Sequence, residues 1–291
     1  MGVAPIYQFG SEEQKKSLLP DLCSGNGLWA FGLTETNAGS DAKGVETIAR
    51  EEQNNWVING TKRYITNGSS ELLKGVTLLV VSDHPDGKKE LSTILVPRNT
   101  NGFTTNRMLG KMMWRASDTA EMSFSDVMVP YSNLLGERGH GLQQMLKTLD
   151  SGRLSIAAMG LGLAQGAFEM AAEYAGKRKQ FGKEIGRYQS ISFKLADMAL
   201  KLELARNTLY NACWLKDHGQ PFGKEAAMAK LYCSEIAKEV ADEAVQIFGG
   251  AGLFQSSAIE RFYRDQRILQ IGEGTSDILR MVISRYLGIV N

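Results

Sequence analysis

The hydrophobic pattern of this chain changes its period near residue 136, which constrains the fold more than any other feature. From about residue 28 to 136, β-branched and aromatic runs alternate with turn signals, such as Trp56-Val57-Ile58 before Asn59-Gly60 and Val76 to Val81 before a turn over Asp83 to Gly87. Short strands at this spacing predict a sandwich or barrel. After Gly141 apolar residues recur at helical spacing, which predicts a bundle of about four helices packed at shallow angles.

The first 27 residues are predicted to carry a small helix. Ser11-Glu12-Glu13-Gln14 has the spacing of a capping box, in which Ser11 and Gln14 satisfy backbone donors at the helix start. Pro20 and Gly25 to Gly27 are expected to close this segment. The chain is therefore predicted to be an α+β multidomain protein with three parts: residues 1–27, a middle β-domain over 28–136 and a C-terminal helical bundle over 137–291.

Charge and cysteine content argue against several classes of protein. The 33 basic and 32 acidic residues leave a net charge of +1, so no strong field favours nucleic acid or a membrane as a partner. The 3 cysteines form no CxxC pair, which argues against a zinc site or a disulfide framework and fits a reducing compartment. The 3 histidines share no helical spacing, so no metal site is predicted. We also expect no transmembrane segment and no signal peptide after Met1.

A carboxylate stands between two glycines in Gly272-Glu273-Gly274-Thr275. Thr275 can cap a helix running to about Leu287. The glycines let the backbone approach a ligand closely, so Glu273 could take a proton from a bound molecule while nearby N–H groups polarise a carbonyl. By spacing alone, an exposed loop glutamate is the simpler interpretation.

Two segments of the β-region have patterns that suit a cofactor. Thr34 to Asp41 is a polar turn with glycine after an apolar strand, and its hydroxyl and N–H groups suit a pyrophosphate. Tyr64 and Thr66 fall on one face of a predicted strand, where they could form an aromatic wall with a hydroxyl donor. A polar loop and an ordinary half-buried strand are the alternatives.

Two segments of the helical region are ambiguous in the same way. A basic run surrounds Phe181-Gly182, where Arg178 could capture a phosphate or simply lie on a solvated helix end. Gly249-Gly250-Ala251-Gly252 lacks the strand-before, helix-after context of a dinucleotide fingerprint, so its glycines are interpreted as helix-end and turn residues. Ser257 to Glu260 after it is predicted to be a second capping box.

Taken together, these segments resemble the acyl-CoA dehydrogenase family, and most closely its short-chain members. The resemblance runs from about Pro5 to the C-terminus and rests on nine motifs in the order of the family: Phe9-Gly10-Ser11-Glu12-Glu13-Gln14-Lys15, Leu33-Thr34-Glu35 with Gly39-Ser40-Asp41, Ile65-Thr66-Asn67-Gly68, Leu149-Asp150-Ser151-Gly152-Arg153, Gln180-Phe181-Gly182, Phe193-Lys194-Leu195-Ala196-Asp197-Met198, Gln246 to Gly250, Tyr263-Arg264-Asp265 and Glu273-Gly274-Thr275.

The resemblance implies an N-terminal helical domain, a middle β-domain and a C-terminal helical bundle. Residues 1–27 are then expected to be a remnant of the first domain, most of which this chain lacks. The implied activity is FAD-dependent α,β-dehydrogenation of a short or branched acyl-CoA thioester to the trans-2-enoyl-CoA, as in the β-oxidation of fatty acids. The implied partners are acyl-CoA, electron-transfer flavoprotein and further copies of the chain in a tetramer or dimer. The implied location is the cytoplasm, or the mitochondrial matrix in a eukaryote.

The motifs also assign residues. Glu273 matches the catalytic base of the family, since Gly152 occupies the position at which some relatives carry the base instead. Residues implied to contact FAD are Phe31, Leu33, Thr34, Ser40, Tyr64, Ile65, Thr66, Thr275, Ser276 and Asp277. Residues implied to hold the ADP part of FAD in an adjacent subunit are Arg178, Gln189, Gln246, Phe248, Gly249 and Gly250, and Phe181 is implied to be a further cofactor contact. Residues implied to contact the acyl-CoA are Ser40, Asp150, Arg153 and Gly274.

One departure from the family bears on specificity, and two alternative functions stay open. Gly272 replaces an aromatic residue that commonly precedes the glutamate, which makes a branched or cyclic acyl group possible. A flavin monooxygenase of the same fold is one alternative, although such relatives generally lack Glu273. A non-catalytic fragment, or a subunit that another chain completes, is the other, because the N-terminal helices of the family help to wall the acyl pocket.

Overall fold

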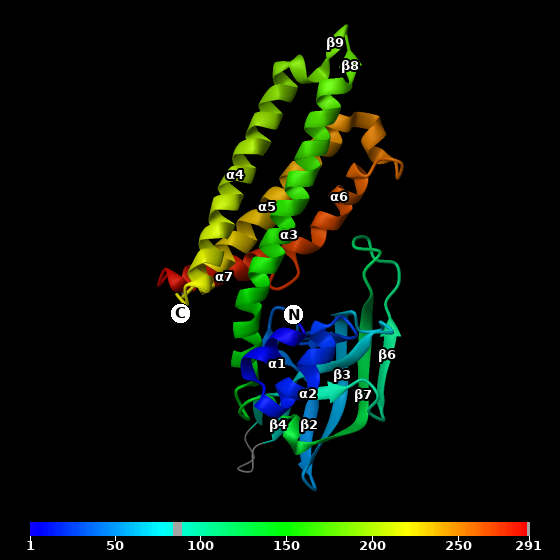
Figure 1. Ribbon diagram of the computed structural model, residues 1–291, viewed down its shortest axis with the longest axis vertical. Coiled ribbons are helices and arrows are strands. Elements are labelled where there is room, and N and C mark those ends of the chain that lie inside the picture. Colours follow the sequence, from blue (N-terminus) through cyan, green and yellow to red (C-terminus); the bar gives the residue numbers. More distant parts are fainter. Residues whose placement is uncertain (84–88, 290–291) are drawn as a thin grey trace. The chain divides into compact units, whose positions relative to one another are not determined.

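The computed structural model describes residues 1–83 and 89–289 and divides into two compact units, Met1–Leu149 and Asp150–Asn291. Figure 1 shows a unit built around a sheet and a unit of long helices. The division falls inside helix α3 (Gly141–Lys177). The start of α3 belongs to the first unit, since Leu142 and Met145 pack in a cluster with Val45 and Leu79.

Two short helices open the first unit, α1 (Val3–Phe9) and α2 (Glu12–Cys23). The predicted capping box of α2 is confirmed, because Gln14 N donates to Ser11 Oγ at 3.2 Å and Ser11 N donates to Gln14 Oε1 at 3.0 Å. The expectation that Pro20 closes the segment is wrong, since α2 continues through Pro20. A proline near the helix end removes one backbone donor, and its own carbonyl still accepts from Ser24 N at 3.0 Å.

The described residues of the first unit form a mixed seven-stranded sheet. Its strands, in sheet order, are β1 (Leu28–Gly32), β4 (Leu73–Asp83), β2 (Ile48–Glu52), β3 (Asn55–Thr66), β7 (Thr119–Pro130) and β6 (Phe103–Arg107), with β5 (Lys89–Pro97) pairing β4. Strands β1 and β2 run parallel to β4, and the remaining pairs are antiparallel. The predicted turn after Asp83 lies outside the described residues.

The core of the sheet comes from the β-branched and aromatic runs that predicted it. Trp56, Ile58, Val76 and Ile94 are fully buried in one cluster. Trp56 stacks on Tyr131 with ring centroids 5.1 Å apart. Burial of each large apolar side chain contributes about 1.5–3 kcal/mol, so this cluster is the main stabilising feature of the β-domain.

The second unit is a helical bundle with a small hairpin. Its elements are the rest of α3, β8 (Lys179–Gln180), β9 (Lys183–Glu184), α4 (Gln189–Asp217), α5 (Gly223–Phe248), α6 (Ile259–Asp265) and α7 (Ser276–Tyr286). Short 3₁₀ turns in the two units cover Ala42–Gly44, Tyr131–Asn133, Ile185–Arg187, Gly249–Leu253 and Gln266–Gln270. Small residues let the helices approach closely, since a Cβ on Gly160 of α3 would lie 2.8 Å from the Cys233 carbonyl oxygen of α5.

The second predicted capping box is wrong. Helix α6 begins after Ala258, and no side chain caps it. Glu260 instead accepts hydrogen bonds from Arg264 one turn later, at 2.7 Å from Nε and 2.9 Å from Nη2. An ion pair at this helical spacing competes for the carboxylate that a capping box needs.

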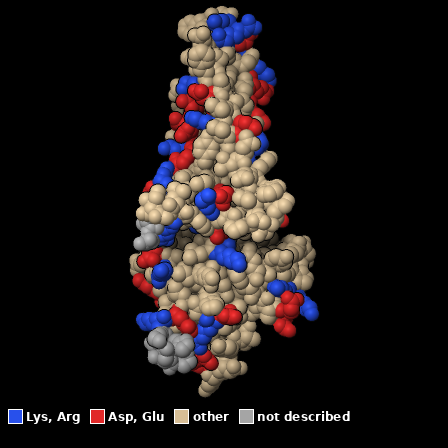
Figure 2. Space-filling view, turned by 90° about the vertical axis from the view of Figure 1, so that its left-hand side faces the viewer, with Lys and Arg blue, Asp and Glu red and all other residues tan. Residues whose placement is uncertain are grey.

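In the helical unit, most charged side chains lie on the surface and the apolar residues of α3 include a buried stripe. Acidic and basic side chains alternate along the helices, and Lys and Arg gather at the end that carries the β8–β9 hairpin (Figure 2). Helix α3 is long and apolar enough to cross a membrane by length and composition alone, which does not decide the expectation that the chain has no transmembrane segment. Core helices pass the same test, and Ala157, Ala164 and Ala171 form a fully buried stripe on α3.

Candidate functional site

The predicted flavin residues of the first unit lie at the end of β1 and on β3. Phe31 and Leu33 pack against a buried cluster, whereas Thr34 is half-buried and Ser40 is exposed. Arg63 N donates to Thr34 O at 2.8 Å, which places the β1 loop beside the end of β3. The fold therefore brings together two segments that lie about 30 residues apart in the sequence.

Tyr64 and Thr66 form an exposed edge on β3. The backbone of Tyr64 is left-handed, with φ of 61°, and its ring is 58% exposed. Tyr64 and Thr66 share the exposed face, as predicted. Ile65 points the other way into the core, at 3% exposure, so its side chain cannot cover a flavin and only its backbone could contact one. An exposed aromatic ring on a strained backbone is typical of a surface that binds a ligand.

A buried ion pair fixes the loop that follows β1. The Lys62 ammonium lies 2.6 Å from Glu35 Oε1, and both side chains are buried. Glu35 also accepts from Glu46 N, Thr47 N and Thr47 Oγ1 at 2.6, 3.1 and 2.6 Å. These contacts satisfy the carboxylate and hold residues 35–47 in one conformation.

The pair changes the titration of both groups. Burial lowers the pKa of Lys62 to about 8, although Glu35 opposes the shift. Burial acts to raise the pKa of Glu35, but Lys62 and the hydrogen bonds outweigh it, so that pKa lies below its ordinary value. The sequence analysis did not predict this pair. Its only signals were Glu35 at the end of the motif Leu33-Thr34-Glu35 and Lys62 inside a half-buried strand.

Seven predicted cofactor residues lie just after α3, next to the β8–β9 hairpin, at the start of α4 and at the end of α5. Figure 1 shows the hairpin at one end of the helical bundle. Arg178, Gln189, Gln246, Gly249 and Gly250 are exposed, Phe181 is 95% exposed with φ of 50°, and the ring of Phe248 stacks on Tyr174 at 4.3 Å. This stacking joins the ends of α3 and α5. The cluster therefore offers a cation, an exposed ring and two amides on one surface.

The remaining predicted residues gather near the start of α7. Thr275 caps α7 by accepting from Ile278 N at 3.2 Å, as predicted. Ser276 Oγ donates to Glu235 at 2.6 Å, and Asp277 is exposed in the first turn. Glu273 and Gly274 both have positive φ, at 56° and 99°.

The Glu273 side chain is half-buried, and one oxygen of its carboxyl is buried and unsatisfied. Oε2 of Glu273 has no hydrogen-bond partner among the described residues. Burial raises the pKa of this carboxyl, while Lys230 and Arg153 partly counteract the rise. An unpaired buried carboxylate costs free energy, and such groups cluster at functional sites. The exposed loop glutamate that spacing alone favoured is therefore not what the structure contains.

Two cations converge on the same place. Arg153 on α3 is buried, and its Nη1 lies 2.6 Å from Asp150 Oδ1. Burial raises the pKa of Asp150, and Arg153 opposes the rise. The ammonium of Lys230 on α5 is fully buried and donates to Gly274 O at 2.6 Å. Sequence reasoning missed Lys230, whose only signal was a lysine within an alanine-rich helical stripe.

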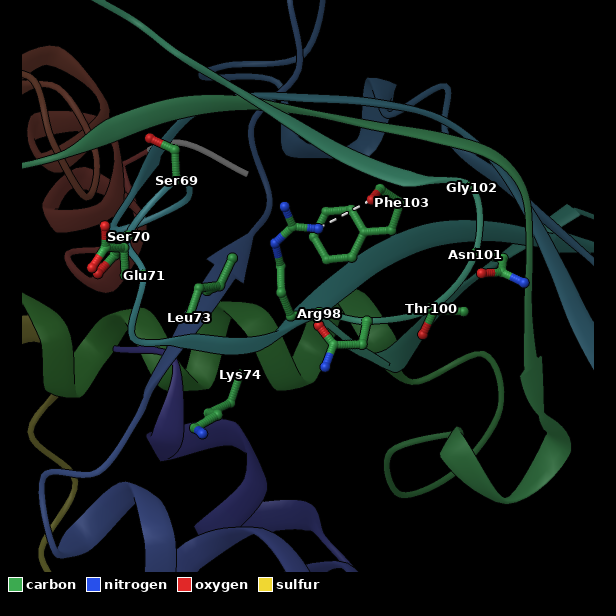
Figure 3. Close-up of a pocket in the computed structure, with 11 residues that line it drawn as sticks. Ser69, Ser70, Glu71, Leu73, Lys74, Arg98, Thr100, Asn101, Gly102 and Phe103 are labelled. Atoms are coloured by element: carbon green, nitrogen blue, oxygen red, sulfur yellow. Dashed lines mark hydrogen bonds between the residues drawn. The ribbon is translucent and has the colours of Figure 1, made fainter.

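A separate polar pocket of about 780 Å³ opens on the β-domain. Figure 3 shows its lining from Ser69 to Lys74 and from Arg98 to Phe103. Arg98 lies over the Phe103 ring and donates to the Phe103 carbonyl oxygen at 3.1 Å, so its charge is engaged locally. None of the predicted site residues lines this pocket.

Among the described residues, no group of three or more His, Cys, Asp or Glu side chains is placed to hold a metal ion.

Comparison with known proteins decides the family. The middle domain of acyl-CoA dehydrogenases matches residues 30–127, and their C-terminal domain matches residues 139–288. The chain belongs to the acyl-CoA dehydrogenase family. The resemblance read from nine motifs is thereby confirmed, as is the combination of a middle β-domain with a helical bundle.

Individual relatives agree with this assignment. A probable acyl-CoA dehydrogenase, YngJ of Bacillus subtilis (strain 168), is 49% identical over 99% of this chain and 75% of its own length. The structure of butyryl-CoA dehydrogenase from Megasphaera elsdenii has a TM-score of 0.94 at 43% identity, covering 98% of this chain and 74% of that one. A glutaryl-CoA dehydrogenase from Mycobacterium smegmatis, solved in complex with FADH2, has a TM-score of 0.93 at 32% identity over 99% and 72% of the two chains. Acyl-CoA dehydrogenases are FAD-dependent oxidoreductases, and this chain is one of them.

Proposed function

We propose that this chain dehydrogenates a short or branched acyl-CoA thioester to its trans-2-enoyl-CoA, with Glu273 as the catalytic base. The observation that carries the assignment of the base is the buried, unsatisfied Oε2 of Glu273 within a left-handed turn. A structural glutamate buried for stability would be hydrogen-bonded or paired. An orphaned carboxylate oxygen is instead suited to accept a proton from a bound molecule.

The residues present fit FAD. At the hairpin end of the bundle, Phe181 is 95% exposed, and an exposed aromatic ring beside the Arg178 cation suits a stacked adenine and a diphosphate. On the β-domain, exposed Tyr64 and Thr66 beside Thr34 suit the flavin ring and its polar edge. Bound FAD supplies the acceptor for the hydride that leaves the β-carbon of the substrate.

Proton removal is the task of the chain itself. The α-proton of a thioester is too weakly acidic for an ordinary carboxylate, so the carbonyl must be polarised as enolate charge develops. We assign this role to the backbone N–H of Glu273, with Gly274 next to it free of side-chain bulk. Burial raises the pKa of Glu273, which strengthens the carboxylate as a base. Asp150 and Arg153, with exposed Ser40, are the proposed contacts to the acyl-CoA.

The physiological setting follows from this activity as a further part of the proposal. Electrons would leave the reduced flavin for electron-transfer flavoprotein, and the chain would act as a homo-oligomer, a tetramer or dimer. The proposed location is the cytoplasm, or the mitochondrial matrix in a eukaryote. Gly272 leaves room beside the base, since a Cβ there would meet nothing closer than Ile268 O at 3.5 Å, and this supports a branched acyl group.

The test is the visible spectrum of the FAD-loaded protein under anaerobic conditions, before and after addition of butyryl-CoA and isobutyryl-CoA. Bleaching of the flavin by either thioester is expected for the wild type. Glu273→Gln should keep its FAD and lose bleaching by a factor of at least about 10³, since the base is removed while shape is kept. Glu71→Gln, at an exposed position of the β-domain, is the control.

Three results would contradict the proposal. Unchanged bleaching in Glu273→Gln would show that another group takes the proton. A wild type that no thioester reduces, but that consumes oxygen and yields a hydroxylated product when air and NADH as reductant are supplied, would favour a monooxygenase. Retention of FAD without either reaction would favour a subunit that needs another chain.

A further inference from the structure

Lys230 is a buried cation placed next to the proposed base. It lies on α5, is fully buried, and donates to Gly274 O at 2.6 Å. Among the described residues it forms no ion pair, and Glu273 and Glu235 oppose the effect of its burial only in part. A long cationic side chain held in this way needs a reason other than stability, because a hydrophobic residue of similar size would cost less to bury.

The hydrogen bond acts on the backbone that carries Glu273. Gly274 has φ of 99° and Glu273 has φ of 56°, so two consecutive residues are left-handed. A non-glycine residue in this region is strained and persists only where its surroundings hold it. The Lys230 ammonium holds the carbonyl group that directly follows Glu273, which fixes the turn and therefore the direction of the carboxyl.

Helix α5 also anchors the two flanks of the same loop. Glu235 accepts from Gln270 Nε2 at 2.8 Å on one side and from Ser276 Oγ at 2.6 Å on the other. Arg280 of α7 lies 3.5 Å from the same carboxylate. The loop between Gln270 and Ser276 is thus tied to α5 at both ends and, through Lys230, in its middle.

Charges around the loop set the protonation of both groups. Within this unit, Glu273 faces Lys230 and Arg153, and Arg153 is itself paired with Asp150. Lys230 faces Glu273, Arg153 and Glu235. Burial lowers the pKa of Lys230 to about 8, so it is mostly charged at neutral pH. On α7, Asp277 and Arg280 pair with each other at 3.4 Å.

We propose that Lys230 is the positioning residue for Glu273: its hydrogen bond to Gly274 O fixes the left-handed turn that carries the Glu273 carboxyl. This inference rests on the proposed role of Glu273. Lys230 itself touches neither substrate nor flavin. It acts only through the backbone turn and through the electrostatic field at the carboxyl.

The experiment compares three variants of the FAD-loaded enzyme. Lys230→Met removes the charge and the hydrogen bond with little change in length. Lys230→Gln removes the charge and retains an amide donor for Gly274 O. Lys238→Met is the matched control, because Lys238 is an exposed lysine two turns later on the same helix.

Two quantities are measured for each variant. One is the pKa of the Glu273 carboxyl, obtained by NMR titration of protein labelled with carbon-13 at the glutamate carboxyl, the signal being assigned by its loss in Glu273→Gln. The other is kcat and KM for the acyl-CoA that bleaches the wild type best. The titration does not depend on turnover.

The expected results separate the two effects. Lys230→Met and Lys230→Gln should both raise the pKa of Glu273 above that of the wild type, since a neighbouring positive charge is lost. Lys230→Met should also lower kcat by about 10² with KM nearly unchanged, because the carboxyl is misplaced. Lys230→Gln should lower kcat less than Lys230→Met does. Lys238→Met should match the wild type in both the pKa of Glu273 and the kinetic constants.

Other outcomes overturn the inference. If Lys230→Met titrates and turns over like the wild type, Lys230 has no positioning role. If it loses activity with an unmoved pKa of Glu273, and Lys230→Gln loses as much, the lysine is only structural. Should Lys230→Met not fold, Lys230→Gln alone decides through the pKa. Full activity in Glu273→Gln, measured in parallel, would contradict the proposed role of Glu273 as the catalytic base.

Discussion

Three predicted site residues, Tyr64, Phe181 and Glu273, have left-handed backbones with φ of 61°, 50° and 56°. Each such conformation costs of order 1 kcal/mol for a side chain of this size. The sequence motifs predict all three to contact FAD or substrate. Strain at these positions therefore agrees with the assignments, since a fold retains strain where function requires a direction that a relaxed backbone would not give.

The raised pKa of Glu273 predicts that the ionised carboxylate lowers the stability of the folded protein at the pH at which it is active as a base. The folded-state pKa lies above the ordinary value of 4.5, so the folded protein binds the proton more tightly than the unfolded chain. Stability from this group is fully present below pH 4.5 and is lost as pH rises through the folded pKa. Glu273→Gln should therefore raise Tm at pH 8 by about 2–4 °C, the effect of about 1 kcal/mol in a protein of this size.

Calorimetry of the two proteins at pH 8 and at pH 4 measures the effect. The gain in Tm should shrink at pH 4, where the wild-type carboxyl is protonated as well. An equal Tm for both proteins at pH 8 would mean that the buried carboxylate carries no penalty. In the wild type, the rate of flavin reduction should rise with pH through the same pKa, because only the ionised carboxylate accepts a proton.

Gly272 is predicted to set the breadth of the acyl site. Its substitution by tyrosine would place a ring next to the base and reduce the space for a branch. We expect Gly272→Tyr to lower kcat/KM for isobutyryl-CoA relative to butyryl-CoA by about 10-fold or more, the discrimination that one methyl group gives in an apolar pocket. Gly272→Ala is the control, since its Cβ would make only ordinary contact with Ile268. Equal losses for both substrates would place Gly272 outside the specificity site.

Between elements, the interactions that shape the site are long-range pairs between a strand or helix and a loop. Lys62 on β3 holds Glu35 after β1, and Lys230 on α5 holds Gly274 before α7. In both cases a rigid element supplies a buried ammonium that fixes a loop carrying predicted site residues. Local capping, by contrast, explains only where helices begin.

The β1–β2 loop should depend on its buried ion pair. Lys62→Met would leave the Glu35 carboxylate buried without its counter-charge, which typically costs about 3–5 kcal/mol. Urea unfolding should show this loss, and FAD affinity should fall because Thr34 and Ser40 lie in the same loop. Lys43→Met, at an exposed lysine of that loop, should change neither quantity. A stable Lys62→Met with normal FAD affinity would show that the loop is held by other contacts.

Close packing of α3 on α5 predicts opposite effects at two glycines. Gly160→Ala would bring its Cβ to 2.8 Å from the Cys233 carbonyl oxygen, so we expect a loss of about 1–3 kcal/mol. Gly162→Ala would meet nothing within 4 Å and should gain up to about 1 kcal/mol from helix propensity. Thermal unfolding of the two variants measures the contrast. Equal effects would mean that the helices can separate without cost.

At the scale of the whole molecule, the predicted residues of the helical unit fall into two groups. Lys230, near Glu273, and Phe248, near Arg178, are 18 positions apart on α5, which corresponds to about 27 Å along the helix. This separation is consistent with the expectation that the Arg178 group serves the FAD of an adjacent subunit. In that proposed arrangement, α5 would link two different sites of an oligomer.

Mixed oligomers test that arrangement. Arg178→Glu and Glu273→Gln should each be inactive alone. Co-expressed as two distinguishable chains, they should recover about a quarter of wild-type activity, because half of random dimers are mixed and each mixed dimer has one intact site. Flavin content and size-exclusion chromatography of the separated species accompany the assay. Mixed oligomers without activity would place Arg178 and Glu273 in the site of one chain.

The sequence by itself determined the change from strands to helices near residue 136, the caps at Ser11 and Thr275, and the motif order that identified the family. These features are encoded by local periodicity and by contacts a few residues apart. Tertiary structure alone decided that Oε2 of Glu273 is buried, that Lys230 reaches Gly274 across 44 positions, and that Lys62 reaches Glu35 across 27. The predictions that Pro20 ends the first segment and that Ser257 caps a helix were wrong. Burial and long-range pairing depend on which elements pack together, and no local spacing carries that information.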